Sequence, residues 1–184
     1  MANLLYVDNS NVWIEGKHVS AVKKGMAPNV WTAQQNKICD NDWKIDFGKL
    51  FQFAGGERAE VKHAVLFGSR PPPNDSLWEA AKRKGFEVVV YDRNVVGKEK
   101  KIDTDVVATM MEDSYERVDP ATDEMTLVAG DADYVPAIEK LKRRKIKVHV
   151  VFWGHAAKEL REAATKFIAL DPYLEHLRMA NVSR

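Results

Sequence analysis

The fold is decided by the stretch Leu4-Leu5-Tyr6-Val7-Asp8-Asn9-Ser10-Asn11, an apolar run of strand length that ends in an acid and two amides. A short apolar run bounded by turn-forming residues is typical of a fully buried strand. In an α/β sheet, the carboxyl ends of the strands open into the crevice where ligands bind. The stretch therefore predicts that Asp8 and Asn11 lie in such a crevice.

The same pattern recurs at Met125-Thr126-Leu127-Val128-Ala129-Gly130-Asp131-Ala132-Asp133, where a strand runs into carboxylates and then into a helix. Further strands are predicted at residues 61–68, 86–91, 146–153 and 167–170, and helices at 46–54, 75–84, 102–118, 133–144, 156–165 and 172–179. Strands that alternate with helices pair in parallel through right-handed crossovers. The predicted fold class is therefore α/β, with a mainly parallel central sheet.

One segment near the start of the chain shows no clear periodicity. Val12-Trp13-Ile14 is predicted to begin a helix, but the polar stretch from Gly16 to Lys44 follows it. This stretch is too long for a casual loop. We predict an insertion or lid at about residues 16–45, with some helix of its own, which Trp31 and Trp43 anchor on the core.

Length and composition indicate a soluble globular protein. The chain has 184 residues, and we predict a single domain over residues 1–184. No stretch approaches the roughly 18 apolar residues of a membrane span. Met1-Ala2-Asn3 leads into a strand without a basic start or a cleavage site, and Cys39 is the only cysteine, so we expect a cytoplasmic protein. The net charge of +1 excludes a strongly basic surface overall, so nucleic acid would have to bind local patches.

Four acids lie at predicted boundaries between a strand or loop and a helix, namely Asp8, Asp103, Asp131 and Asp133. Gathering that many carboxylates is costly, because like charges raise each other's pKa and resist ionisation. A divalent cation removes this cost, and oxygen ligands without cysteine or histidine favour Mg²⁺ or Mn²⁺ over zinc. Such a site suits phosphodiester hydrolysis, in which a metal ion activates water for attack at phosphorus.

Polar and basic residues flank these acids. Ser10 and Asn11 are predicted to orient a phosphate or a metal-bound water, and Arg70 with Lys101 to hold the nucleic-acid backbone on either side. Solvation is the simpler interpretation of the basic run that ends at Lys101. Asp103 is also predicted to cap the helix that follows it, because a carboxylate is preferred at that position.

Three other kinds of site do not fit these motifs. The sequence Gly130-Asp131-Ala132-Asp133 opens like an EF-hand loop, but no third acid or glycine follows at the required offsets. An aspartyl phosphatase would need a second acid two residues after Asp8, where this chain has Ser10. A dinucleotide fold would need Gly-x-Gly-x-x-Gly after the first strand, and none occurs there.

Four motifs, in this order, together resemble the LabA-like branch of the NYN domain, within the PIN-like nuclease superfamily. They are Tyr6-Val7-Asp8-Asn9-Ser10-Asn11, Phe67-Gly68-Ser69-Arg70-Pro71-Pro72-Pro73, Lys101-Ile102-Asp103-Thr104 and Ala129-Gly130-Asp131-Ala132-Asp133-Tyr134. The resemblance extends over roughly residues 4–170. It implies a three-layer α/β/α fold, PIN-like and Rossmann-like, that depends on Mg²⁺ or Mn²⁺ and cleaves RNA endonucleolytically or exonucleolytically.

The resemblance also implies roles for individual residues. The matching positions make Asp8, Asp103 and Asp131 the metal-binding acids, with Asp133 as a further catalytic acid and Asn11 assisting. The substrate-binding candidates are Ser10, Asn11, Ser69, Arg70, Lys101 and Thr109. RNA is the expected partner, with single-stranded DNA and a second copy of the chain as further candidates.

One position departs from the family pattern. Members commonly have another acid about six residues after the position of Asp103, and here that position is Thr109. A threonine can hold a metal-bound water but cannot neutralise an ion. The first hypothesis is therefore a metal-dependent ribonuclease. The alternative is a non-catalytic or regulatory nucleic-acid-binding module with a partly degenerate site, and the third hypothesis is a metal-dependent phosphatase or nucleotide hydrolase.

Overall fold

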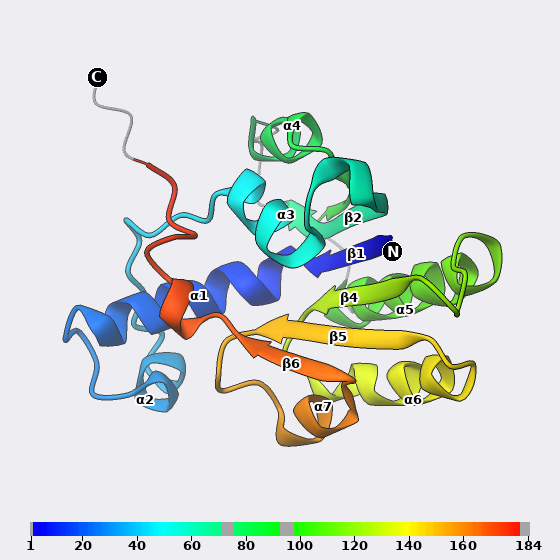
Figure 1. Cartoon of the computed structure of the whole chain (residues 1–184). Coiled ribbons are helices and arrows are strands. Elements are labelled where there is room, and N and C mark those ends of the chain that lie inside the picture. The colour runs from blue at the N-terminus through cyan, green and yellow to red at the C-terminus, as the bar shows by residue number, and fades with distance from the viewer. Residues whose placement is uncertain (1, 71–75, 93–97, 181–184) are drawn as a thin grey trace.

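A single six-stranded sheet forms the centre of the protein in the computed structural model, which describes residues 2–70, 76–92 and 98–180 apart from the side chains of residues 70, 92 and 98–100 (Figure 1). The strands are β1 (Asn3–Asp8), β2 (Val61–Arg70), β3 (Glu87–Asp92), β4 (Glu124–Val128), β5 (Lys147–Phe152) and β6 (Lys166–Ala169). They lie in the order β3-β2-β1-β4-β5-β6, and every pair of neighbours is parallel. The predicted α/β class with a parallel sheet is confirmed.

Helices cover both faces of this sheet and give the molecule three layers (Figure 1). The α-helices are α1 (Asn9–Lys23), α2 (Val30–Gln35), α3 (Phe47–Gly55), α4 (Ser76–Arg83), α5 (Lys98–Glu116), α6 (Val135–Arg143) and α7 (Lys158–Ala163), and short 3₁₀ turns occur at η1 (Arg58–Glu60), η2 (Ala132–Tyr134) and η3 (Asp171–Tyr173). One core cluster joins α1, α3 and α4 to the sheet, and a second joins α5, α6 and α7 to its other face. In the described part of the chain, no helix is both long and apolar enough to cross a membrane.

The apolar run of β1 is buried on both faces because it lies in the middle of the sheet. Leu5 and Val7 belong to the core cluster beneath α3, whereas Leu4 and Tyr6 belong to the cluster beneath α5. Side chains of successive strand residues point to opposite faces. A strand covered on both sides therefore needs the unbroken apolar sequence that the chain has here.

A buried carboxylate fixes α5 to the sheet at some distance from the end of β1. Asp113 of α5 accepts a hydrogen bond of 2.7 Å from the Tyr6 hydroxyl, lies 2.6 Å from Nδ1 of His63 on β2, and accepts a 2.7 Å bond from Nε of Arg117. His63 is thereby held within its strand, because its other ring nitrogen, Nε2, lies 3.0 Å from Glu87 of β3. Because the carboxylate of Asp113 has three partners, its burial does not leave an unsatisfied charge.

The order of the strands determines where a ligand can reach the sheet. From β1, the chain builds outward through β2 and β3 on one side and through β4, β5 and β6 on the other. The direction of growth reverses between β1 and β4, and open α/β sheets bind ligands at the carboxyl ends of strands at such a point. The acids after β1 and β4 therefore face the crevice expected from the topology.

The structure extends the helical content of the segment near residue 16. Residues up to Lys23 continue α1, and α2 forms a further short helix, so part of the predicted insertion belongs to a core helix. Trp43 anchors the segment as predicted, because it is fully buried against Trp153 with ring centroids 5.7 Å apart. The prediction is wrong for Trp31, which is 63% exposed. A role as a lid stays a prediction.

The predicted terminal helix at residues 172–179 is wrong. Only the 3₁₀ turn η3 forms, and the following residues run antiparallel to the segment around Ile45, which pairs with Arg178. The carbonyl of Leu177 accepts a 2.8 Å bond from the amide of Asp46, and the amide of Met179 donates a 2.8 Å bond to Lys44. These backbone bonds to another segment satisfy groups that a helix would have paired internally.

Candidate active site

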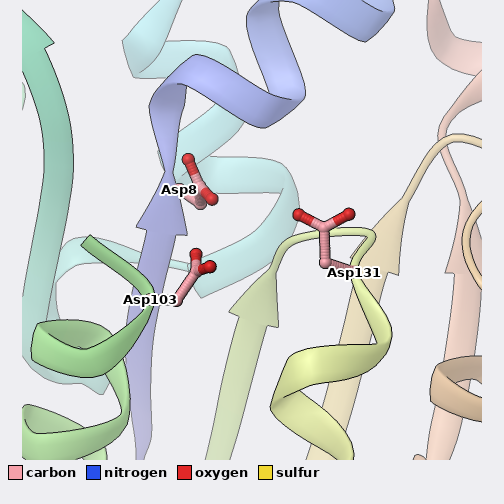
Figure 2. Close-up of side chains that lie close together, drawn as sticks. All are labelled: Asp8, Asp103 and Asp131. Atoms are coloured by element: carbon pink, nitrogen blue, oxygen red, sulfur yellow. The ribbon is translucent and has the colours of Figure 1, made fainter. Parts of the chain in front are cut away.

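Three carboxylates from separate parts of the chain meet at the crevice (Figure 2). Asp8 is the last residue of β1, Asp103 belongs to α5, and Asp131 follows β4. One ligand oxygen from each lies within 4.8 Å of those of the other two. We call these residues the acidic cluster. Residues far apart in sequence meet here because parallel strands end at the same edge of the sheet.

Asp8 is held in place by the start of α1. Its Oδ1 accepts a 3.2 Å hydrogen bond from the backbone amide of Asn11, so the carboxylate caps the helix as well as pointing into the crevice. The side chain is buried, and burial is the largest cause of a pKa raised to about 7. Repulsion from Asp103 and Asp131 raises this pKa further, while the Asn11 amide and the Tyr134 hydroxyl act against the rise.

Two polar side chains connect the members of the acidic cluster. Nδ2 of Asn11 donates a 2.8 Å hydrogen bond to Oδ2 of Asp131. The hydroxyl of Tyr134 donates a 2.8 Å bond to Oδ1 of Asp103 and also lies 3.4 Å from Oδ2 of Asp8. Burial, followed by the nearby carboxylates, raises the pKa of Tyr134 far above its ordinary value, so its hydroxyl remains a donor.

The donor set fits a hard divalent cation. All three acids offer oxygen ligands, and Oδ1 of Asn11 is buried without a hydrogen-bond partner among the described residues. This oxygen is an acceptor that lies beside the acidic cluster. A bound cation would supply the partner that it lacks and would offset the repulsion between the carboxylates. Asp131 is exposed to solvent, so the cluster is accessible from its side.

The other predicted site residues make contacts of their own outside the acidic cluster. Ser10 and Ser69 lie next to each other, with their hydroxyl oxygens 3.4 Å apart. The amino group of Lys101 lies 4.7 Å from the ring centre of Tyr91. Asp133 is exposed on η2 and does not belong to the group of three. The side chain of Arg70 lies outside the described residues.

Helix α5 differs from the sequence expectations at its start. Asp103 does not cap this helix, because α5 begins at Lys98 and the basic run forms its first turn. Thr109 lies six residues after Asp103 on the same helix, which is about 9 Å along the axis and on a different face. Thr109 therefore does not lie beside Asp103 on the helix. Its role in substrate binding stays a prediction.

Tyr134 is a site residue that the sequence reasoning missed. It lies in the motif at residues 129–134, but a tyrosine at the start of a helix is usually expected to pack against the core. Its hydroxyl could be assigned only after the fold brought η2 next to α5 and β1. The available signal was its position, three residues after an acid at the end of a predicted strand.

Comparison with known proteins identifies the family. The sequence model of the NYN domain matches residues 9–171. The chain belongs to the NYN domain family. This domain is part of the PIN-like nuclease superfamily, so the chain has a nuclease-type fold, and the predicted family is confirmed. Its assignment to the LabA-like branch stays a prediction.

One solved structure confirms the fold. The NYN chain resembles the crystal structure of a protein of unknown function from Vibrio parahaemolyticus, with a TM-score of 0.64 and 20% sequence identity over 92% of each chain. At this level of identity the likeness concerns the fold alone. No curated protein matches the chain.

Proposed function

We propose that the protein is a metal-dependent nuclease that hydrolyses phosphodiester bonds of RNA at the acidic cluster, with single-stranded DNA as a further candidate substrate. The observation that carries the proposal is the meeting of Asp8, Asp103 and Asp131 within 4.8 Å at the crevice of an NYN domain. These three residues would hold Mg²⁺ or Mn²⁺. When bound, such an ion supplies positive charge to the phosphate and lowers the pKa of a water molecule.

The residues around the acidic cluster contribute orientation. The side chain of Asn11 holds the carboxylate of Asp131, and Tyr134 holds the carboxylate of Asp103. Since the amide of Asn11 holds Asp8, each of the three carboxylates has a hydrogen bond that orients it. Ligands held by further hydrogen bonds bind metal ions more tightly than mobile ones. Ser10 and Ser69 lie side by side at the ends of β1 and β2, where their hydroxyl groups could donate to a phosphate oxygen.

Cleavage of a labelled single-stranded RNA with Mn²⁺ tests the proposal. We expect Asp131→Asn and Asp8→Asn each to lower the cleavage rate on the order of 100-fold or more, because each removes a charged ligand. Asparagine is also a good N-cap, so Asp8→Asn should keep the start of α1 intact. Asp42→Asn is the matched control, since the side chain of Asp42 is 92% exposed on the surface and should not affect cleavage.

Other outcomes would favour different functions. Cleavage that survives both substitutions would show that the acidic cluster does not perform the reaction. RNA binding without product, unaffected by both substitutions, would favour the regulatory nucleic-acid-binding module, in line with Thr109 in place of a further acid. Hydrolysis of small phosphoesters without cleavage of RNA would favour the phosphatase.

A further inference from the structure

One tryptophan of the chain is exposed on the same edge of the sheet as the acidic cluster. Among the five tryptophans, Trp43 and Trp153 are fully buried, Trp78 is 4% exposed and Trp13 is partly buried, whereas Trp31 on α2 is 63% exposed. Exposing a large apolar ring to water is unfavourable, so an isolated exposed tryptophan next to a cavity is a candidate for ligand contact.

A cavity of about 340 Å³ lies next to this ring. It is lined by Val19 and Val22 of α1, Val30 and Trp31 of α2, and His155 and Asp171, which follow β5 and β6. Because the last two residues come after carboxyl ends of strands, the cavity opens on the edge that carries the acidic cluster. A volume of this size accommodates one planar ring system with a few polar groups.

Hydrogen bonds fix the surroundings of the exposed ring. Oε2 of Glu15 on α1 lies 2.6 Å from Nε2 of His155 and accepts a 2.7 Å bond from Gln34 of α2. The His155 ring in turn meets Trp31 edge to face, with centroids 5.8 Å apart. α2 is therefore joined to α1 and to the loop after β5, so Trp31 is presented from a defined position.

One face of α1 connects the cavity to the acidic cluster. Asn11, Glu15, Val19 and Val22 follow one another at spacings of four, four and three residues, which places them on one side of the helix. Asn11 bonds to Asp131 at one end of this row, and the two valines line the cavity at the other. Asn11 and Val19 are separated by about 12 Å along the helix axis, a length that a few nucleotides can span.

We propose that this cavity is a nucleobase-binding subsite, in which an unpaired base stacks on Trp31 while a phosphate of the same strand lies at the acidic cluster. The inference rests on the proposed nuclease function and adds the single-stranded character of the substrate. Proteins hold single strands by stacking bases on aromatic rings, together with positive charge along the backbone. The carboxylate of Asp171 opposes a phosphate in the cavity but can accept hydrogen bonds from base N–H groups.

Two substitutions of Trp31 separate stacking from other effects. With a single-stranded RNA of about 12 nucleotides, we expect Trp31→Ala to raise KM roughly 5- to 100-fold, because stacking on the ring is lost. We expect Trp31→Phe to retain most of the affinity, because a phenyl ring still stacks. Neither should change Mn²⁺-dependent hydrolysis of a nitrophenyl phosphodiester, which has no base to place in the cavity.

Tyr115→Ala is the matched control for loss of an exposed aromatic ring. Tyr115 is 70% exposed near the end of α5 and lies outside the cavity, so its loss should leave both reactions unchanged. Trp31 is exposed, so its replacement should not affect folding. A circular dichroism spectrum that matches the unsubstituted protein would verify this for each variant.

Fluorescence gives a readout that does not depend on cleavage. RNA that stacks on Trp31 should quench tryptophan emission, and this quenching should be absent in both Trp31→Ala and Trp31→Phe, although the second variant still binds. If the protein cleaves RNA and Trp31→Ala has an unchanged KM, the subsite is wrong while the nuclease function stands. If no RNA is cleaved but the quenching depends on Trp31, the nuclease function is wrong while base binding stands.

A protein partner on the same surface would also overturn the proposal. Sedimentation of the protein without RNA distinguishes that case, because a second copy seated on Trp31 would give a dimer that Trp31→Ala converts to a monomer. We expect the sedimentation of both forms to be identical.

Discussion

At the scale of single residues, the Tyr134 hydroxyl is the contact on which the arrangement of the acidic cluster most depends. It is buried, and it bonds to Asp103 while lying close to Asp8. Its raised pKa keeps it protonated, so it is a donor rather than a further negative charge among the carboxylates. It therefore reduces repulsion in the cluster without contributing a metal ligand of its own.

Replacing this hydroxyl should weaken the metal site without unfolding the protein. We expect Tyr134→Phe to weaken Mn²⁺ activation of cleavage by about 10- to 100-fold, the usual effect of losing a group that orients a metal ligand. The KM for RNA at saturating Mn²⁺ should change little. Calorimetric titration with Mn²⁺, together with rates measured over a range of metal concentrations, checks the prediction.

Tyr6→Phe is the matched control for Tyr134→Phe. Tyr6 is equally buried and its hydroxyl donates to Asp113, which does not belong to the acidic cluster. Both substitutions should lower the free energy of unfolding by about 1 kcal/mol or slightly more. Equal losses of Mn²⁺ activation in the two variants would contradict a specific role for Tyr134.

At the scale of secondary-structure elements, α1 joins the acidic cluster to the proposed subsite, and its packing explains why its length was not predicted. Its buried positions include Gly16, His18 and Ser20, so the inner face of the helix carries little of the apolar periodicity used to recognise a helix. The close approach of Trp43 and Trp153 requires a small residue at Gly16. These contacts come from distant parts of the chain and have no local signal.

A single alanine can test this packing. A Cβ at Gly16 would lie 2.4 Å from Cζ3 of Trp43 and 2.8 Å from Cζ2 of Trp153. Helix propensity alone would make Gly16→Ala stabilising by about 1 kcal/mol. We expect overpacking against the two tryptophans to outweigh this gain. The free energy of unfolding, measured with urea, should fall by about 1 to 3 kcal/mol.

Gly48→Ala is the control for this substitution. Gly48 lies in α3, and the nearest atom to its added Cβ is Cδ of Lys84 at 3.0 Å, part of a flexible side chain that can move. We expect this variant to be neutral or stabilised by up to about 1 kcal/mol. If both glycine variants were stabilised alike, the contact of α1 with the two tryptophans would be looser than described.

The elements also indicate which parts of the site the sequence could predict. Asp8 and Asp131 follow short apolar runs, and the carboxyl ends of parallel strands converge, so their meeting could be predicted from local pattern and topology. The hydrogen bond of Tyr134 to Asp103 and the exposure of Trp31 depend on where helices settle on the sheet. No periodicity in the sequence encodes that placement. The role of Tyr134 was therefore missed, and the burial of Trp31 was predicted wrongly.

At the scale of the whole molecule, the buried carboxylate of Asp123 links the start of the chain to two distant segments. Asp123 accepts hydrogen bonds from the amino group of Lys62, from the amide of Asp119 at 2.9 Å and from the amide of Ala2 at 3.3 Å. Burial alone would raise its pKa, but these bonds outweigh burial and lower the pKa to about 2. The carboxylate therefore stabilises the fold in its ionised form.

The sign of this shift determines how stability depends on pH. The pKa of Asp123 is lower in the folded protein than the ordinary value of 3.8, so its contribution is complete above about pH 4 and is lost as the pH falls through about 2. We expect Asp123→Asn to lower the free energy of unfolding at pH 7 by about 1 to 2 kcal/mol. Urea unfolding at a series of pH values measures this.

The difference between Asp123→Asn and the unsubstituted protein should shrink as the pH falls from about 4 to 2, because the carboxylate becomes protonated first in the unfolded state and then in the folded state. Asp42→Asn, at an exposed position, should give no such convergence. A difference that stays constant over this range would mean that Asp123 does not act through its charge.

β1 is hydrogen-bonded to β2 along its length and to β4 along nearly all of it, and Asp8 is its last residue. Thermal opening of a protein begins at its edges and loops and reaches a central strand last. The wall of the crevice that β1 forms is therefore as stable as the fold itself, whereas Asp131 lies on the exposed segment after β4 and its carboxylate is held by the hydrogen bond from Asn11. The two sides of this small space are thus held by different means, one by the pairing of strands and the other by a single side-chain hydrogen bond.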